Sequence, residues 1–224
     1  MENKTRAPLR LALIGMSGTG KTFWTKKLTE SGLPGKSCDD HIEECLRPRL
    51  SAGGYEGING VAAWMGWPDS PTYLEREAAY LAEEISALDG FLTELERNPS
   101  QELILDTTGS VIHTGNNLLM RLRRQMTVVH LAASAGEQQL LVERYLGDPK
   151  PVLWRGIFQP RPRETARETV ARCYPALIAA RRQSYEVLAH CTLPVAELRE
   201  SAGNPPMSAA EFLQKISAQI DRRG

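Results

Sequence analysis

LRLALIGMSGTGKTFW, residues 9–24, places an apolar run directly before a glycine-rich turn and the start of a helical segment. Gly15 to Thr22 follow the pattern Gly-x-x-x-x-Gly-Lys-Thr, which is the Walker A spacing in the strand-to-helix context that this motif requires. Glycines let the backbone turn tightly so that several N–H groups point at one phosphate, and the positive end of the following helix dipole adds to the attraction. The stretch therefore predicts a phosphate-binding loop.

Each part of this loop has an expected role in binding a nucleotide. We expect Lys21 to place its charge on the β- and γ-phosphates, and the Thr22 hydroxyl to be one of the hard oxygen ligands that Mg²⁺ prefers. The sequence has no guanine-binding Asn/Thr-Lys-x-Asp pattern, which favours ATP over GTP. The alternative is a glycine-rich turn without a ligand, which would not need the complete motif. The expected nucleotide-binding residues are Gly15, Ser17, Gly18, Thr19, Gly20, Lys21 and Thr22.

A second carboxylate fits the same chemistry. The run Leu103-Ile104-Leu105 ends in Asp106, and Asp106 to Gly109 follow the Asp-x-x-Gly form of a Walker B motif. Parallel strands bring their carboxyl ends to one edge of a sheet, so we expect Asp106 to lie beside the phosphate loop and hold Mg²⁺, directly or through water. The alternative is an aspartate that caps a helix or a turn.

Short apolar runs alternate with longer helical patterns along the chain, which is typical of a parallel sheet covered by helices. The expected strands cover residues 11–14, 103–105, 127–131 and 191–195, with a weaker one at 35–38. Helices are expected near 71–97, 116–125, 137–146, 164–189 and 208–222. The fold class is therefore α/β: a P-loop NTPase with a five-stranded parallel sheet flanked by helices on both faces, in a single domain at 1–224.

Three local patterns carry further expectations. Residues 147–163 are irregular and rich in proline, and we expect them to form a mobile lid. Asp40 and Glu43 have the spacing of a capping box, which assigns Asp40 to a helix N-terminus. In the helix at 71–97, a packed face with three-four spacing is predicted from Leu74, Ala78, Leu81, Ile85, Leu88, Leu92 and Leu95.

Composition excludes several classes of partner. The 27 Lys and Arg residues balance the 27 Asp and Glu residues, so we expect neither nucleic-acid nor membrane binding driven by overall charge. The four cysteines form no CxxC pair, which favours reduced thiols and a cytoplasmic setting. The polar N-terminal residues lead into an apolar run too short for a signal peptide or a membrane span. The oligomeric state is left open.

With these motifs in place, the sequence resembles shikimate kinase, a small P-loop kinase of the nucleoside-monophosphate-kinase type. Beyond the phosphate loop, the likeness is carried by SCDDHIEECL at 37–46, LILDTTGSV at 103–111 with TVVHLAAS at 127–134, KPVL at 150–153 and ARRQSYEVLA at 180–189. The resemblance implies ATP- and Mg²⁺-dependent transfer of a phosphoryl group to a hydroxyl of a small, carboxylate-bearing acceptor. It also implies that residues 53–71 are an insertion on the acceptor side, because the family is shorter than this chain.

The resemblance assigns the acceptor residues position by position. Asp39 stands at the aspartate that binds the acceptor and accepts its hydroxyl proton, while Ser37 replaces a second family aspartate, so that Asp106 would have to compensate for a missing Mg²⁺ contact. Gly109 alone remains of three glycines that approach the substrate. Thr107 and Thr108 stand at the other two, and we expect these β-branched side chains to reshape that wall of the pocket.

Cationic residues complete the implied site. Arg181 stands at the arginine that binds the substrate carboxylate, for which a bidentate guanidinium is suited. Arg76 is the candidate for a second substrate arginine, with a solvent-exposed position as the alternative. Lys150 replaces an arginine of the family's lid motif, and Arg155 is a candidate to supply the guanidinium that acts on the transferring phosphoryl group.

Three functions are compatible with these residues. The first is a shikimate kinase proper. The second is a kinase of the same build acting on another polyol acid, sugar acid or nucleotide. Two departures from the family favour the second function over the first: threonines stand in place of the two glycines before Gly109, and Ser37 stands in place of an aspartate. The third is an ATP-binding switch or adaptor without small-molecule kinase activity. Trp64 and Trp67 line either an acceptor pocket or the packed core.

Overall fold

A five-stranded, entirely parallel sheet forms the centre of the computed structural model, which describes residues 7–198 and 206–222. The strands are β1 (Arg10–Ile14), β2 (Gly35–Ser37), β3 (Leu103–Asp106), β4 (Thr127–Ala132) and β5 (Cys191–Pro194). They lie in the order β2-β3-β1-β4-β5. Because all of them are parallel, each strand is joined to the next one in the sequence by a crossover connection. The expected five-stranded α/β fold is confirmed, including the weak strand β2.

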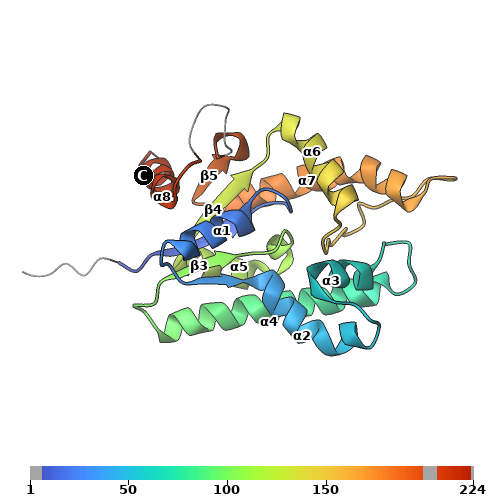
Figure 1. Ribbon diagram of the computed structural model, residues 1–224, viewed down its shortest axis with the longest axis horizontal. Coiled ribbons are helices and arrows are strands. Elements are labelled where there is room, and N and C mark those ends of the chain that lie inside the picture. The colour runs from blue at the N-terminus through green and yellow to red at the C-terminus, as the bar shows by residue number, and fades with distance from the viewer. Residues whose placement is uncertain (1–6, 199–205, 223–224) are drawn as a thin grey trace, which may run out of the picture.

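Helices cover both faces of the sheet (Figure 1). They are α1 (Lys21–Glu30), α2 (Cys38–Ser51), α3 (Gly57–Met65), α4 (Tyr73–Arg97), α5 (Asn116–Gln125), α6 (Ala135–Gly147), α7 (Ala166–Leu188) and α8 (Ala209–Asp221). Short 3-10 turns, η1 and η2, occupy Val111–His113 and Val195–Glu197. Among the described residues, no helix is both long enough and apolar enough to cross a bilayer.

Alternation along the strands divides the core between the two faces. Leu11 and Leu13 of β1 belong to a cluster with α1 and α8, where the rings of Trp24 and Phe212 stack with centroids 4.1 Å apart. Ala12 and Ile14 belong to the larger cluster with α2, α4, α5 and α7. Because side chains of a strand point alternately to opposite faces, one short strand contributes to both cores.

Helix α4 is where the sequence prediction fails in part. Its bounds agree with the expected helix, but Leu74 is 75% exposed and Ile85 37% exposed. The first half of the helix instead buries Tyr73, Glu77, Tyr80 and Glu84. The predicted face and the observed buried face coincide only from Leu88 onward. Four buried side chains with polar groups need partners from distant parts of the chain, which spacing alone does not reveal.

Helices α2 and α3 also differ from expectation. Ser37, and not Asp40, is the N-cap of α2: its hydroxyl accepts a hydrogen bond from the Asp40 N–H at 3.1 Å, so that Asp39 and Asp40 both lie in the first turn. The segment 53–71 contains the unpredicted helix α3. In Figure 1, the chain between α6 and α7 passes close to α3. Several apolar side chains of this segment between α6 and α7 are buried: Val152, Leu153, Trp154 and Phe158.

Candidate active site

The phosphate loop joins β1 to α1 at the carboxyl edge of the sheet. Gly15 has φ +140°, and a Cβ at this position would lie 2.7 Å from the Leu131 carbonyl oxygen, so only glycine fits there. Gly20, the N-cap of α1, has φ +98°. Lys21 is buried, and its Nζ donates to the carbonyl oxygens of Gly15 at 3.0 Å and Met16 at 3.3 Å. The charge of Lys21 is therefore held inside the curve of the loop.

A cavity of about 430 Å³ opens beside this loop. The expected site residues that line it are Ser17, Gly18, Gly20, Lys21, Thr22, Asp39, Gly109, Lys150 and Arg181. They come from the loop itself, the first turn of α2, the segment after β3, the segment after α6, and α7. The fold thus brings together in one cavity residues that are up to 164 positions apart, taking Ser17 and Arg181 as the ends.

Asp106 ends β3 next to the loop and is 3% exposed. Its Oδ1 has no hydrogen-bond partner among the described residues. Burial raises the pKa of Asp106, while the charge of Lys21 and a hydrogen bond with Thr22 lower it. An unpaired carboxylate oxygen next to the Thr22 hydroxyl is a donor set of the kind that a hard divalent cation prefers.

A cation at this position would need further oxygen ligands. Within residues 7–198 and 206–222, no group of three His, Cys, Asp or Glu side chains is arranged to hold a metal ion. This is compatible with Mg²⁺ in P-loop proteins, where one or two protein oxygens are completed by nucleotide phosphates and water. Thr22 and Asp106 therefore fit a nucleotide-dependent Mg²⁺ site.

Asp39 lines the same cavity from the first turn of α2. The Tyr80 hydroxyl, itself buried, donates a hydrogen bond to Asp39 Oδ1 at 3.1 Å. Burial raises the pKa of Asp39 to about 6; the positive charge of Lys21 opposes this rise and the Asp106 carboxylate adds to it. A half-buried carboxyl with a pKa close to neutrality is suited to accept a proton from a substrate hydroxyl.

The segment after β3 does not form the threonine-lined wall that the sequence predicts. Thr107 donates from its Oγ1 to the Leu13 carbonyl at 2.8 Å, and the Thr108 hydroxyl donates to the Glu84 carboxylate. Both threonines are buried away from the cavity, and of the three positions only Gly109 lines it. The expectation of reshaping by these two side chains is therefore wrong, because each hydroxyl finds a partner inside the protein.

Glu84 was not singled out from the sequence, although it lies at the centre of this arrangement. It is 1% exposed, and it also accepts a hydrogen bond from the Ser110 hydroxyl at 2.7 Å. Burial raises the pKa of Glu84 to about 7, although the hydrogen bonds from Thr108 and Ser110 lower it. Glu84 and Tyr80 are four residues apart on α4, so one helix face contacts both the 107–110 segment and Asp39.

Arg181 is held from α7 against the same segment. Its Nη1 donates to the Gly109 carbonyl at 2.7 Å and its Nη2 to the Leu153 carbonyl at 2.5 Å. The side chain is 3% exposed, and its Nε has no hydrogen-bond partner among the described residues. The Tyr185 hydroxyl also donates to the Gly109 carbonyl. Arg181 therefore lines the cavity, and its buried Nε is the guanidinium nitrogen without a partner among the described residues.

The remaining expected cations differ in position. Lys150 lines the cavity but forms an ion pair with Asp148 at 2.8 Å. Arg76 does not line it: the guanidinium lies 5.4 Å from the Trp64 ring centroid and donates to the Trp64 carbonyl. Arg155 also lies outside the cavity lining.

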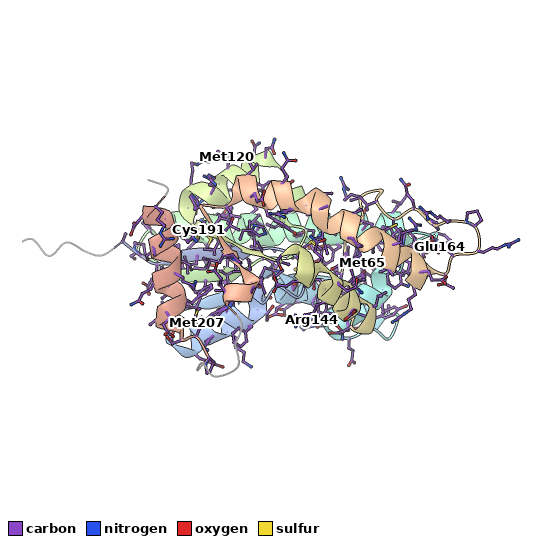
Figure 2. All side chains as sticks on the ribbon, turned by 90° about the horizontal axis from the view of Figure 1, so that it is seen from above. Met65, Met120, Arg144, Glu164, Cys191 and Met207 are labelled. Atoms are coloured by element: carbon purple, nitrogen blue, oxygen red, sulfur yellow. The ribbon has the colours of Figure 1, made fainter. Side chains whose placement is uncertain are left out.

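A second cavity, of about 410 Å³, also borders the phosphate loop and shares Gly18, Gly20 and Phe23 with the first. It is lined by Gly18, Thr19, Gly20, Phe23, Trp24, Arg144, Val195 and Leu198. Arg144, labelled in Figure 2 on α6, donates from Nη1 to the Gly18 carbonyl at 3.0 Å. No sequence motif singles out Arg144, because its contact with the loop depends on how α6 packs beside it. A planar guanidinium and an aromatic ring at this position suit a heteroaromatic base.

Comparison with solved structures shows the same fold over nearly the whole chain. Shikimate kinase from Acinetobacter baumannii in complex with shikimate is 22% identical with a TM-score of 0.56, over 96% of this chain and 94% of that one. Shikimate kinase from Aquifex aeolicus is 16% identical with a TM-score of 0.53, over 96% and 99% of the two chains. That from Bacteroides thetaiotaomicron is 17% identical with a TM-score of 0.51, over 96% of each. No family model matches the sequence, and no curated protein matches it.

Proposed function

We propose that this protein transfers the γ-phosphoryl group of ATP to a hydroxyl of a small, anionic acceptor. The observation that carries the proposal is the shared cavity in which Lys21 of the phosphate loop, Asp39 and Arg181 all take part. Phosphoryl transfer needs a phosphate cradle, a group that orients the nucleophile and cations that neutralise charge, and these are the residue types present. The shikimate kinase fold is compatible with the same reaction.

The nucleotide is placed by the phosphate loop and its two flanking cavities. The loop N–H groups and Lys21 bind the β- and γ-phosphates, and the adenine occupies the cavity between Phe23 and Arg144. Thr22 and Asp106 hold Mg²⁺, which supplies charge neutralisation on the phosphate oxygens. Lys21 then exchanges its hydrogen bonds with the loop carbonyls for hydrogen bonds with phosphate oxygens.

Asp39 orients the acceptor hydroxyl and takes its proton. The acceptor oxygen forms a bond to the γ-phosphorus, the bond from that phosphorus to the β,γ-bridging oxygen breaks, and ADP leaves. The acceptor's anionic group binds the guanidinium of Arg181, which lines the cavity. Positioning and charge supply most of the rate acceleration in such a reaction.

The segment 147–163 acts as the lid in this proposal. Its closure over the bound nucleotide brings Lys150 or Arg155 to the γ-phosphate and excludes water, which would otherwise compete as acceptor. Lys150 already lines the cavity, and its movement requires that it leave both Asp148 and the Asn59 side-chain oxygen. Arg155 starts from outside the cavity lining. Arg76 contributes to acceptor binding only if it leaves the Trp64 ring.

Measurement of ADP release by the purified protein tests the proposal. The protein is given Mg-ATP alone, and then with shikimate or with a panel of hydroxy acids, sugar acids and nucleosides. Stimulation by one acceptor, abolished in Lys21→Ala, is the expected result. Shikimate as the preferred acceptor would make the protein a shikimate kinase, and another acceptor would make it a related kinase.

The competing function is an ATP-binding switch or adaptor without small-molecule kinase activity. Under that reading, the protein binds ATP with the same loop but releases no ADP with any acceptor in the panel. Isothermal titration with a nonhydrolysable ATP analogue separates this outcome from loss of the nucleotide site. Binding of the analogue without any turnover would refute the kinase and retain the loop.

A further inference from the structure

A third cavity, of about 470 Å³, lies between α3 and the segment that follows α6. One wall consists of residues from α3 and the turn after it: Asn59, Ala62, Ala63, Met65, Gly66 and Trp67. Tyr145 and residues 147–152 form the other wall. Met65, labelled in Figure 2, is buried at this wall. Six of the thirteen lining residues thus come from the segment 53–71, which the sequence resemblance treats as an insertion.

This cavity adjoins the proposed acceptor site. Lys150, Pro151 and Val152 line both cavities. On α3, Ile58 lines the acceptor cavity and the next residue, Asn59, lines the third one. An acceptor bound at Asp39 and Arg181 therefore has a second space beside it, against the same short stretch of chain.

The walls of the third cavity suit an apolar ring. Trp67 and Tyr145 face each other edge to face, with ring centroids 6.2 Å apart, and both line the cavity. Small residues, Ala62, Ala63 and Gly66, leave open space beside them. Aromatic side chains next to an open space bind flat apolar groups by burial and by edge or face contacts.

The polar residues of this cavity are paired with one another. Asn59 Nδ2 donates to Asp148 Oδ1 at 2.8 Å, and Lys150 Nζ forms its ion pair with Asp148 Oδ2. Lys150 also donates to the Asn59 side-chain oxygen. While Lys150 and Asp148 are paired their charges compensate each other, and when Lys150 leaves, the Asp148 carboxylate repels an anion. In both cases the cavity favours an uncharged occupant over a second anionic group.

We propose that the third cavity binds an apolar, aromatic arm of the acceptor. The substrate is then a hydroxy acid that carries this arm in addition to the polar group held at Asp39 and Arg181. This inference rests on the proposed kinase function and specifies its substrate class. Asn59, Asp148 and Lys150 border the two parts of the acceptor. Trp67 and Tyr145 determine the preference for the ring.

The cavity itself is tested without nucleotide or turnover. Line broadening in ¹⁹F NMR measures the binding of 4-fluorobenzyl alcohol to the full-length protein, to Ala62→Leu and to Ala63→Leu. The added side chains fill the cavity, so saturable binding is expected only in the unmodified protein and in Ala78→Leu, a control on the exposed face of α4 outside both cavities. Absence of saturable binding, or equal binding in both filled variants, overturns the proposal whatever the enzymatic activity.

The link to the acceptor is tested by ADP release with 3-phenyllactate and lactate, which differ by the ring alone. We expect kcat/KM to be more than about tenfold higher for 3-phenyllactate, because burial of a ring is worth at least this ratio. Ala62→Leu and Ala63→Leu should remove the preference and leave turnover of lactate unchanged. A preference that persists in both variants overturns the inference. If the probe binds but neither of these acids nor any acceptor of the panel stimulates ADP release, the kinase function fails and the cavity stands as a binding site. If acceptors of the panel stimulate ADP release but 3-phenyllactate does not, the inference is overturned and the kinase function stands.

Discussion

Replacing Tyr80 by Phe removes one hydroxyl, which donates a hydrogen bond to Asp39 Oδ1. The ring of Tyr80 is buried in the core under the cavity, and phenylalanine fills the same space. The variant therefore tests a single interaction without opening a cavity in the core. Because the hydrogen bond favours the charged form of Asp39, its loss should raise the pKa of that carboxyl further.

The size of the shift follows from the strength of the bond. A hydrogen bond to a charged group contributes about 1.5 kcal/mol at the lower end of its range, and one pKa unit corresponds to about 1.4 kcal/mol. With a pKa of about 6 in the unmodified protein, Asp39 in Tyr80→Phe should titrate about one unit higher. The base acts in its deprotonated form, so kcat/KM rises with pH through this pKa. Activity near pH 6 and 7 should therefore fall, while activity at pH 8 and above should be nearly retained.

The assay is the pH profile of kcat/KM for ADP release, measured with the acceptor that stimulates best. Tyr73→Phe is the matched control, since its hydroxyl is also buried on α4 but donates to Glu77 at 2.9 Å and does not contact Asp39. We expect the acidic limb to move upward in Tyr80→Phe and to stay in place in Tyr73→Phe. An unchanged limb in Tyr80→Phe, or equal shifts in both variants, would refute the role of Asp39 as the base oriented by Tyr80.

Three further variants probe other parts of the site. Asp106→Asn should raise the Mg²⁺ concentration for half-maximal ADP release on the order of tenfold, whereas an unchanged Mg²⁺ dependence would remove Asp106 from the metal site. Arg144→Ala should raise KM for ATP about fivefold with kcat retained, and a change confined to the acceptor KM would contradict the adenine placement. Glu84→Gln should gain stability relative to the unmodified protein as pH rises from 5 to 8, by a few kcal/mol. The folded-state pKa of about 7 lies above the ordinary 4.5, so the unmodified protein loses stability as pH rises over this interval. Chemical denaturation at pH 5 and pH 8 measures the difference in unfolding free energy between the two proteins, and an equal difference at both pH values would contradict the prediction.

The sheet and the phosphate loop could be predicted because their signals are local. Leu11 to Ile14 form an unbroken apolar run, and the glycines after them follow a spacing that only a phosphate loop requires. A Cβ atom added at Gly15 would lie 2.7 Å from the Leu131 carbonyl oxygen, which is the physical constraint behind the first glycine of that spacing. Asp106 could be placed next to the loop by the same reasoning, since parallel strands share one carboxyl edge.

The N-terminus of α2 and the helix α3 could not be derived in this way. Ser37 and Asp40 are both good N-cap residues, and three positions separate them, so either choice leaves a complete helix. In α3, Gly57 and Gly60 lower the helix propensity of a nine-residue segment. Its apolar side chains, with Val61, Trp64 and Met65 buried, stabilise it through packing that involves distant residues.

The buried face of α4 explains why the polar interior of the site had to come from the structure. Tyr73, Glu77, Tyr80 and Glu84 are spaced by three and four residues, as regularly as the leucines from which the opposite prediction was made. Hydrophobicity favours the leucine face, yet the other face is buried because each polar group finds a partner.

Those partners tie α4 to Asp39 and to the residues on either side of Gly109, and Asp39 and Gly109 both line the cavity beside the phosphate loop. Asp39 meets Tyr80 across 41 positions, and Ser110 meets Glu84 across 26. A buried carboxyl such as Glu84 without the hydroxyls of Thr108 and Ser110 would be strongly destabilising, and threonine at 108 without Glu84 would leave a buried hydroxyl unpaired. Thr108, which departs from the shikimate kinase pattern, and Glu84 are therefore physically coupled, and a substitution that removes the hydrogen-bonding group at one position should be tolerated only with a matching change at the other.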